Sequence, residues 1–152
     1  MSEISLLSIN EITEKINSLN KNSIPRWGKM SSPQMLKHCS KFIDLYLGKI
    51  SVPFWYKYFG ITIGKLFLRY ISKKSPLETP RNIRTDKSLK ITDENLDFDS
   101  EKKVLIYKLI KLHDINGQIN HPIYGSMKSE KILFLIKHHT IHHLNQFNLI
   151  MN

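Results

Sequence analysis

The stretch IKHHTIHHLNQF, residues 136–147, places four histidines at helical spacing among apolar residues. Successive residues of an α-helix are rotated by about 100°, so side chains four positions apart lie side by side. The four imidazoles therefore form two pairs that point in different directions, His138 with His142 and His139 with His143. The histidines could form a solvated face, pack in the core or bind a metal. Which interpretation applies to each pair depends on whether that pair faces the core.

The apolar residues of this segment predict which pair faces inward. His139 and His143 fall within about 60° of the centre of the apolar stripe on a helical wheel, whereas His138 and His142 fall outside it. We therefore expect the first pair to point into the core and the second to point outward or sideways. The stripe is formed by Ile132, Ile136, Phe147 and Ile150.

Two inward imidazoles one turn apart need partners. Burying polar groups unpaired costs free energy, and two histidinium charges at this spacing would repel each other. A divalent metal meets the need, because two histidines at i,i+4 on one helix can supply two neutral nitrogen ligands. The alternative is a pair of core histidines that bond to hydroxyl or carbonyl groups. Spacing alone leaves both interpretations open.

A third ligand would have to come from a facing helix, and His38 is the best candidate. His121 is a weaker candidate for a ligand or for a partner of one, and His113 is more simply a cation near a helix C-terminus. Cys39 is expected to pack in the core. The apolar face that His38 borders is formed by Met35, Leu36, Cys39, Phe42 and Tyr46.

Hydrophobic periodicity and capping residues predict an all-α fold without a convincing pair of strands. Ser8 and Glu11, for example, stand at capping-box spacing before an apolar-periodic segment. We expect an up-and-down four-helix bundle with one additional helical segment, in a single domain of residues 1–152. The five expected helical segments are residues 8–20, 32–49, 52–71, 98–114 and 126–150.

Two segments stand apart from this pattern. The connection at residues 74–97 is longer than a compact domain usually needs, so we expect it to cover one end of the bundle or to serve function. The most apolar segment, residues 52–71, carries Lys57, Lys65 and Arg69 where membrane insertion would be costly. We interpret it as a buried helix, with a membrane-surface helix as the alternative.

Composition indicates a folded globular protein. The chain has 152 residues, of which 41% are hydrophobic, and its single cysteine excludes an internal disulfide framework. The N-terminal residues lack the order of a secretory signal, so a cytoplasmic location is expected. The net charge of +10 comes from lysines spread along the chain, which is typical of a solvated surface. We therefore do not expect nucleic acid or membrane as the principal partner.

Three blocks of the sequence together resemble a known family. They are RWGKMSSPQMLKHCS at residues 26–40, HPIYG at 121–125 and HTIHHLNQF at 139–147. In order and spacing they are similar to the signatures of the DinB/YfiT-like superfamily of candidate metalloenzymes, and especially to a bacterial subfamily without an assigned function. The resemblance runs from about residue 25 to residue 147.

The resemblance implies a four-helix bundle in which one histidine of the second helix and an H-x-x-x-H pair of the last helix hold a metal. Carried over to this chain, the ligands are His38, His139 and His143, and the helical wheel selected the same pair. Other signature positions are expected to support the ligands or to pack around the mouth of the site: Trp27, Met30, His121, Tyr124, His142 and Gln146.

Three neutral histidines would leave at least one coordination position open, as in a reactive site, and all-imidazole ligation favours zinc or nickel. Characterised members of the superfamily include metal-dependent thiol S-transferases and a thiol-dependent isomerase. The resemblance therefore implies activation of a low-molecular-weight thiol for reaction with an electrophile, or of water, by a protein that can pair as a homodimer. The alternatives are a basic module for nucleic acid or an anionic membrane surface, and a bundle with a purely structural metal. No catalytic carboxylate is singled out.

Overall fold

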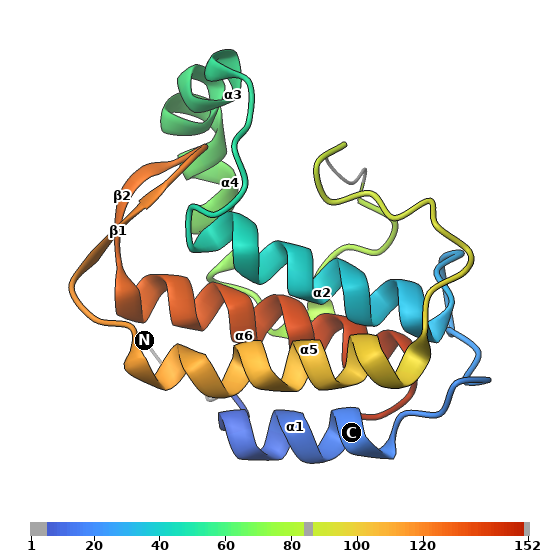
Figure 1. Ribbon diagram of the computed structural model, residues 1–152. Helices are drawn as coiled ribbons and strands as arrows, with labels where there is room; N and C mark the ends of the chain where they lie inside the picture. The colour runs from blue at the N-terminus through green and yellow to red at the C-terminus, as the bar shows by residue number, and fades with distance from the viewer. Residues whose placement is uncertain (1–5, 84–86, 151–152) are drawn as a thin grey trace.

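The computed structural model describes residues 6–83 and 87–150. Residues 1–5, which belong to the N-terminal stretch judged not to be a secretory signal, lie outside these ranges. So do residues 84–86 of the long connection. The described residues form a four-helix bundle, a helical arm and a small hairpin (Figure 1). The predicted helical bundle with an additional helical segment and a long connection is confirmed. Its four helices are α1 (Ile9–Ser18), α2 (Ser32–Tyr46), α5 (Phe98–Lys111) and α6 (Ser129–Gln146).

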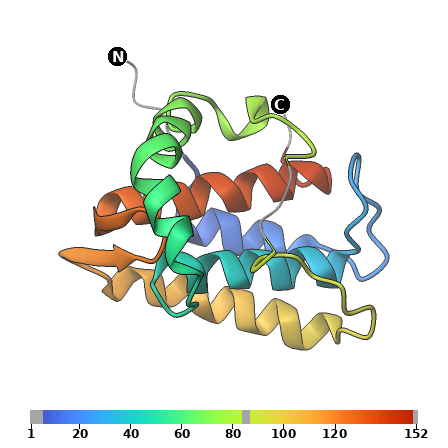
Figure 2. The ribbon, with the colours of Figure 1, turned by 90° about the horizontal axis from the view of Figure 1, so that it is seen from above.

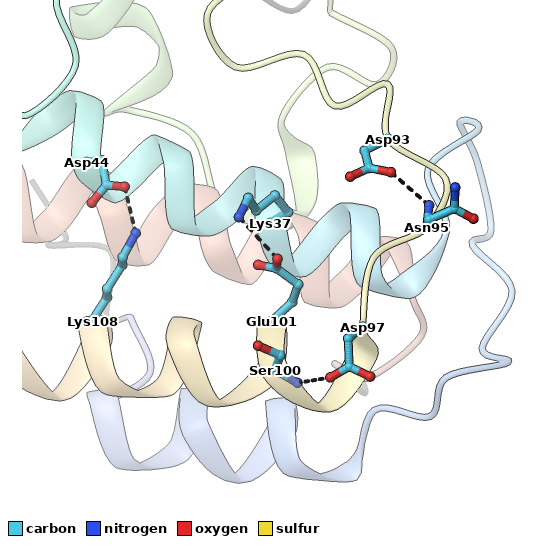
Figure 3. A network of polar contacts seen from close by, with 8 residues as sticks. All are labelled: Lys37, Asp44, Asp93, Asn95, Asp97, Ser100, Glu101 and Lys108. Atoms are coloured by element: carbon cyan, nitrogen blue, oxygen red, sulfur yellow. Dashed lines mark hydrogen bonds and ion pairs between the residues drawn. The ribbon is translucent and has the colours of Figure 1, made fainter.

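Predicted caps mark the starts of helices. Ser8 and Glu11 form a reciprocal capping box at the start of α1. At the start of α5, the Asp97 carboxylate accepts a hydrogen bond from the Ser100 N–H at 2.7 Å (Figure 3). These side chains satisfy N–H groups that the first turn of a helix leaves without backbone partners. The helix boundaries therefore follow from local chemistry.

The core lies between the four helices. Each helix turns its apolar residues inward, with Ile12, Leu36, Leu105 and Ile136 fully buried. On the outer side, two ion pairs join α2 to α5, as Figure 3 shows. Lys37 reaches Glu101 at 3.1 Å, and Lys108 reaches Asp44 at 2.6 Å.

The direction of the helices depends on the long excursion between α2 and α5. Figure 1 shows that α2 and α5 run in the same direction, while α1 and α6 run in the opposite one, so the helices do not alternate in the up-and-down order that was expected. Residues 47–97 carry the chain back to the end of the bundle where α2 begins. As a result α6 packs against α2, which brings the histidines of the last helix opposite His38.

Residues 54–71 form the helical arm, which stands beside the hairpin in both ribbon views (Figures 1 and 2). It consists of α3 (Phe54–Phe59), a π-helical turn (Gly60–Gly64) and α4 (Lys65–Ile71). The interpretation of this segment as a buried helix is wrong, because Phe54 is 82% and Tyr58 is 73% exposed. None of the described helices is long and apolar enough to cross a bilayer.

Glycines explain why the arm leaves its large side chains outside. A Cβ added to Gly60 would lie 2.3 Å from Ile123, and one added to Gly64 would lie 2.7 Å from the Tyr124 ring. The arm therefore packs on the hairpin through a glycine face. Leu68 is among its few buried side chains.

The segment before the last helix is a β-hairpin. Strands β1 (Gln118–His121) and β2 (Gly125–Lys128) pair antiparallel, with His121 opposite Gly125. The expectation of no strand pair, and of a last helix that begins at Ser126, is wrong. Gly125 has a φ of +77°, which lets a three-residue loop reverse the chain. The helix begins only at Ser129, whose N–H bonds to the Gly117 carbonyl.

Candidate metal centre

Three histidines from two helices converge inside the bundle. The Nε2 atom of His139 lies 3.1 Å from Nε2 of His38 and 3.3 Å from Nε2 of His143. Candidate ligand nitrogens of all three lie within 4.8 Å of one another. Nitrogens bound to a tetrahedral zinc at about 2.0–2.1 Å would be about 3.3 Å apart. The spacing of the three imidazoles therefore suits one small divalent cation.

The long connection fixes the tautomer of His38. Its Nδ1 atom lies 3.0 Å from the main-chain carbonyl oxygen of Leu89. A carbonyl oxygen can only accept, so Nδ1 carries the proton of the neutral ring. The Nε2 atom of His38 then presents a lone pair to the other two histidines.

Gln146 fixes the tautomer of His143 in the same way. The Gln146 amide nitrogen donates to the carbonyl of Trp27 at 2.7 Å, which orients the amide and leaves its oxygen as an acceptor. That oxygen lies 2.8 Å from Nδ1 of His143, so Nδ1–H donates and Nε2 presents its lone pair inward. Gln146 and Trp27, both expected near the site, thus lie directly behind a candidate ligand.

His139 lies between these two lone pairs, and the protein alone cannot satisfy it. Its Nδ1 atom is buried without a hydrogen-bond partner among the described residues. A neutral imidazole has one N–H, so His139 can donate to His38 or to His143 but not to both. With the proton on Nδ1, three lone pairs would face one another. A cation that accepts all three is the group that this donor set fits.

The ring of His139 is also held in place by packing. It stacks on Phe42 with ring centroids 3.6 Å apart and planes 7° from parallel. Because Phe42 follows His38 by one turn on α2, a single helix supplies both a candidate ligand and the surface that orients another.

The centre keeps its histidines neutral. Burial lowers the pKa of His38, and burial together with the neighbouring imidazoles lowers the pKa of His139 well below its usual value. Burial is also the main cause that lowers the pKa of His143 to about 3. Metal binding requires deprotonated imidazole, so all three rings are in the state that a metal needs.

The other histidine pair of α6 lies outside the centre. His138 was expected to point outward or sideways, but it is 2% exposed, which is a correction. Its Nε2–H donates to the carbonyl of Lys74 at 3.0 Å, because the long connection packs over this side of α6. His142 is half-buried, and its Nδ1–H donates to the carbonyl of Pro76 at 3.2 Å. Both side chains hold the connection against α6.

His121 and Tyr124 lie farther along α2, at the hairpin. The ring of His121 packs against Tyr46 at 4.4 Å and against Tyr124 at 4.6 Å between centroids. Tyr46 in turn stacks on Phe42 at 4.2 Å. His121 is thus connected to the three histidines through a row of rings and is not among them. His113 is exposed beyond the end of α5.

A cavity of about 430 Å³ joins these groups. The three histidines, His121 and Tyr124 all line it. No aspartate or glutamate of the described chain does so. Apolar and aromatic side chains form most of its wall, from α2, α6, the arm and the long connection, among them Phe42, Phe67, Ile71, Ile83, Leu89 and Leu135.

Some contributors to this site leave no signal in the sequence. The carbonyl groups of Leu89, Lys74 and Pro76 orient histidines, yet every residue has a carbonyl group. We expected the long connection to cover the bundle or to serve function. That expectation indicates the segment as a whole but not which of its carbonyl groups contact the histidines. The Phe42 stacking surface was visible as an apolar neighbour of His38, but its role depends on the angle between α2 and α6.

The fold and the site define this chain as a helical-bundle protein with a three-histidine candidate metal centre. Residues 1–149 match the model of a family described as a protein of unknown function (DUF1569), and the chain belongs to this family. Comparisons with curated proteins and with solved structures give no match.

Proposed function

We propose that this protein is a divalent-metal-binding member of the DinB/YfiT-like superfamily, and that it is an enzyme that activates a low-molecular-weight thiol or water. One observation carries the proposal. Acceptors behind His38 and His143 fix the tautomers of both rings, so that their Nε2 lone pairs converge on His139. His139 cannot donate to both of them, and its Nδ1 atom has no hydrogen-bond partner among the described residues. The DUF1569 family is generally placed in this superfamily, which supports the proposal.

The proposed ligands are His38, His139 and His143, and zinc or nickel suits three imidazoles. A bound divalent cation would supply Lewis acidity that lowers the pKa of a thiol or a water molecule at its open position. The three proposed ligands are neutral and no carboxylate of the described chain lines the cavity, so the protein would not offset the positive charge of a bound cation. This favours an anionic partner such as a thiolate.

The walls of the cavity favour a thiol reaction over a hydrolytic one. Phe42, Phe67 and Leu135 line it, and such apolar walls exclude water. They would also hold an apolar electrophile beside the thiolate. An open position on a cation bound by the three histidines, together with the apolar walls of the cavity, would support an S-transfer reaction with the electrophile bound over the three histidines.

The first test is metal content. Protein purified without a histidine tag and without chelators is expected to contain about one divalent metal per chain by elemental analysis. His38→Ala, His139→Ala and His143→Ala should each lose it. His113→Ala, at an exposed position, should keep it, as should His138→Ala, whose ring faces a carbonyl. Wild-type protein without stoichiometric metal would contradict the proposal.

The second test separates an enzyme from a bundle with a structural metal. Metal-loaded protein would be assayed with a panel of low-molecular-weight thiols and electrophiles, and also for hydrolysis without thiol. Turnover that disappears in His143→Ala supports an enzyme. A melting temperature that falls on metal removal, without turnover of any substrate pair, would favour the structural role.

The exposed arm favours a second candidate function, binding to an anionic membrane surface. Residues 51–77 contain no acidic residue but carry Lys57, Lys65 and Arg69 between aromatic side chains, followed by two more lysines. Helices with interleaved basic and aromatic residues can lie in the headgroup region of a bilayer. The large exposed apolar side chains of the arm include Phe54, Trp55, Tyr58, Phe59, Ile63, Leu66 and Tyr70.

Vesicle sedimentation tests this candidate. The protein is expected to bind vesicles of phosphatidylcholine with phosphatidylserine more tightly than vesicles of phosphatidylcholine alone, and to lose affinity as salt increases. Lys65→Gln combined with Arg69→Gln should weaken binding, whereas Lys103→Gln on the bundle should not. Equal binding to both vesicle types, unchanged by salt, would exclude an anionic surface as the partner.

A further inference from the structure

His121 is a buried polar group that the proposed metal centre leaves unexplained. It is 1% exposed, and its Nδ1 atom accepts hydrogen bonds from the main-chain N–H groups of Ile123 and Tyr124 at 3.0 and 3.2 Å. A nitrogen that accepts carries no proton, so the neutral ring has its proton on Nε2. This Nε2–H donor has no hydrogen-bond partner among the described residues. Buried donors are rarely left unpaired, so one is an indication of function.

The position of His121 points to the cavity. The ring lines the same 430 Å³ space as the three histidines, and this volume lies within the roughly 300–1,000 Å³ of small-molecule sites. The hairpin backbone occupies Nδ1, so Nε2 is the ring nitrogen that lacks a partner among the described residues. Burial lowers the pKa of His121 to about 4, which keeps the ring neutral and makes Nε2–H a donor without a charge.

The other groups around the cavity restrict the ligand. Tyr46 is hydrogen-bonded to Tyr124, so its hydroxyl is already engaged beside His121. No carboxylate of the described chain lines the space, which disfavours a cationic ligand or an amine. The remaining wall is mostly apolar. A fitting molecule is therefore apolar, with an oxygen that accepts one hydrogen bond.

We infer that the cavity binds an apolar small molecule carrying a carbonyl group, and that the Nε2–H of His121 donates a hydrogen bond to the carbonyl oxygen. Neutral imidazole can act in this way, polarising a carbonyl without a formal charge. The inference deepens the proposed function, on which it rests for the reaction, because it names a carbonyl compound as the class of electrophile.

Acetophenone and α-methylstyrene provide a matched pair of probes, since they differ only by a C=O group in place of C=CH₂. Dissociation constants of both would be measured by ligand-detected NMR for the metal-loaded wild type and for His121→Phe. The ratio of the two constants cancels their different hydrophobicity, as in a double-mutant cycle. We expect the preference for the ketone to fall about five- to tenfold in His121→Phe, the size of one net hydrogen bond.

Two further variants distinguish the effect of losing the N–H donor from the effect of changing the shape of the side chain. His121→Gln keeps an acceptor for the hairpin and an N–H donor for the ligand, so it should retain most of the ketone preference. His113→Phe, at an exposed position, should behave as wild type. A ratio that is the same in wild type and in His121→Phe would overturn the inference.

Two measurements keep the inference independent of the metal proposal and of variant folding. After metal removal the ketone preference should persist. If the preference instead disappeared without metal but survived in His121→Phe, the carbonyl oxygen would bind the metal and not His121. In ¹⁵N-labelled wild type, acetophenone should shift the His121 Nε2–H resonance and α-methylstyrene should not. An identical response to both probes would contradict the inference even if no variant folds.

Discussion

At the scale of single residues, the candidate centre depends on groups that stand behind the ligands. Gln146 accepts from His143 and donates to Trp27, so one amide sets both the tautomer and the angle of the ring. The acceptor behind a metal-binding histidine raises its basicity and fixes its orientation. This role leads to a prediction that the ligand variants do not test.

Gln146→Leu should weaken metal binding without removing a ligand. The leucine leaves the Nδ1–H of His143 without its acceptor and frees the ring to adopt the other tautomer. We expect metal affinity to fall about 10- to 100-fold, the usual effect of losing such a partner. Competition with a chromophoric chelator would measure it. Gln118→Leu, in the hairpin, is the control, and equal affinities of the two variants would contradict the role of Gln146.

At this scale the sequence predicted the convergence of the three histidines, and the family resemblance predicted Gln146 and Trp27 near them, but the main-chain carbonyl behind His38 left no signal. Spacing on α6 selected His139 and His143, and the apolar edge of α2 selected His38, because both features depend only on helical periodicity. The wheel failed for His138, since burial of that face depends on a connection without periodicity of its own. The role of the three residues as ligands stays a prediction until metal content is measured.

At the scale of secondary-structure elements, the arm shows how small residues can decide packing. Apolar content alone predicts burial for residues 52–71, yet the face that packs is the glycine face. Gly60 and Gly64 are one turn apart, and both lie against the hairpin. Glycine gives no hydrophobic signal, so periodicity could not identify this face. The hairpin escaped prediction for a different reason, because its four-residue strands are too short to show alternation.

Gly60→Ala should either detach the arm from the hairpin or force the backbones of the arm and the hairpin out of their positions. The added Cβ would lie 2.3 Å from Ile123 Cγ2 and 2.4 Å from the Ile123 carbonyl oxygen, so the backbone itself would have to move. Overpacking of this kind typically costs about 1–3 kcal/mol. Hydrogen exchange should accelerate in residues 54–71, and urea unfolding should show the loss of stability.

Thr62→Ala is the matched control, because Thr62 lies in the same π-helical turn but is exposed. We expect its effect to stay within about 0.5 kcal/mol. If Gly60→Ala unfolded with the same midpoint as Thr62→Ala, and exchange in the arm were unchanged, the glycine face would not be the contact that holds the arm.

At the scale of the whole molecule, the bundle buries several neutral imidazoles in one region. This arrangement follows from topology, because the excursion through the arm and the long connection places α6 beside α2 and wraps main-chain carbonyls around the rings. The four-helix class could be predicted from periodicity. The direction of each helix could not, since it depends on how residues 47–97 cross the bundle.

Buried neutral histidines make the stability of the metal-free protein depend on pH. Burial lowers the pKa of His121 to about 4 and is the main cause that lowers that of His143 to about 3, whereas an unfolded chain titrates near 6.5. Between these values the unfolded state binds protons that the folded state does not. The free energy of unfolding is therefore highest above about pH 6.5 and falls as the pH decreases, by up to about 1.4 kcal/mol per pH unit for each histidine.

Urea unfolding of chelator-treated protein between pH 8 and pH 4 would measure this dependence, and His121→Phe isolates the contribution of one ring. Since the phenylalanine cannot bind a proton in either state, its curve should be flatter than that of wild type between pH 6.5 and 4, by up to about 1.4 kcal/mol per pH unit. Parallel curves would mean that His121 binds protons equally in both states, and the burial assigned to it here would then be wrong.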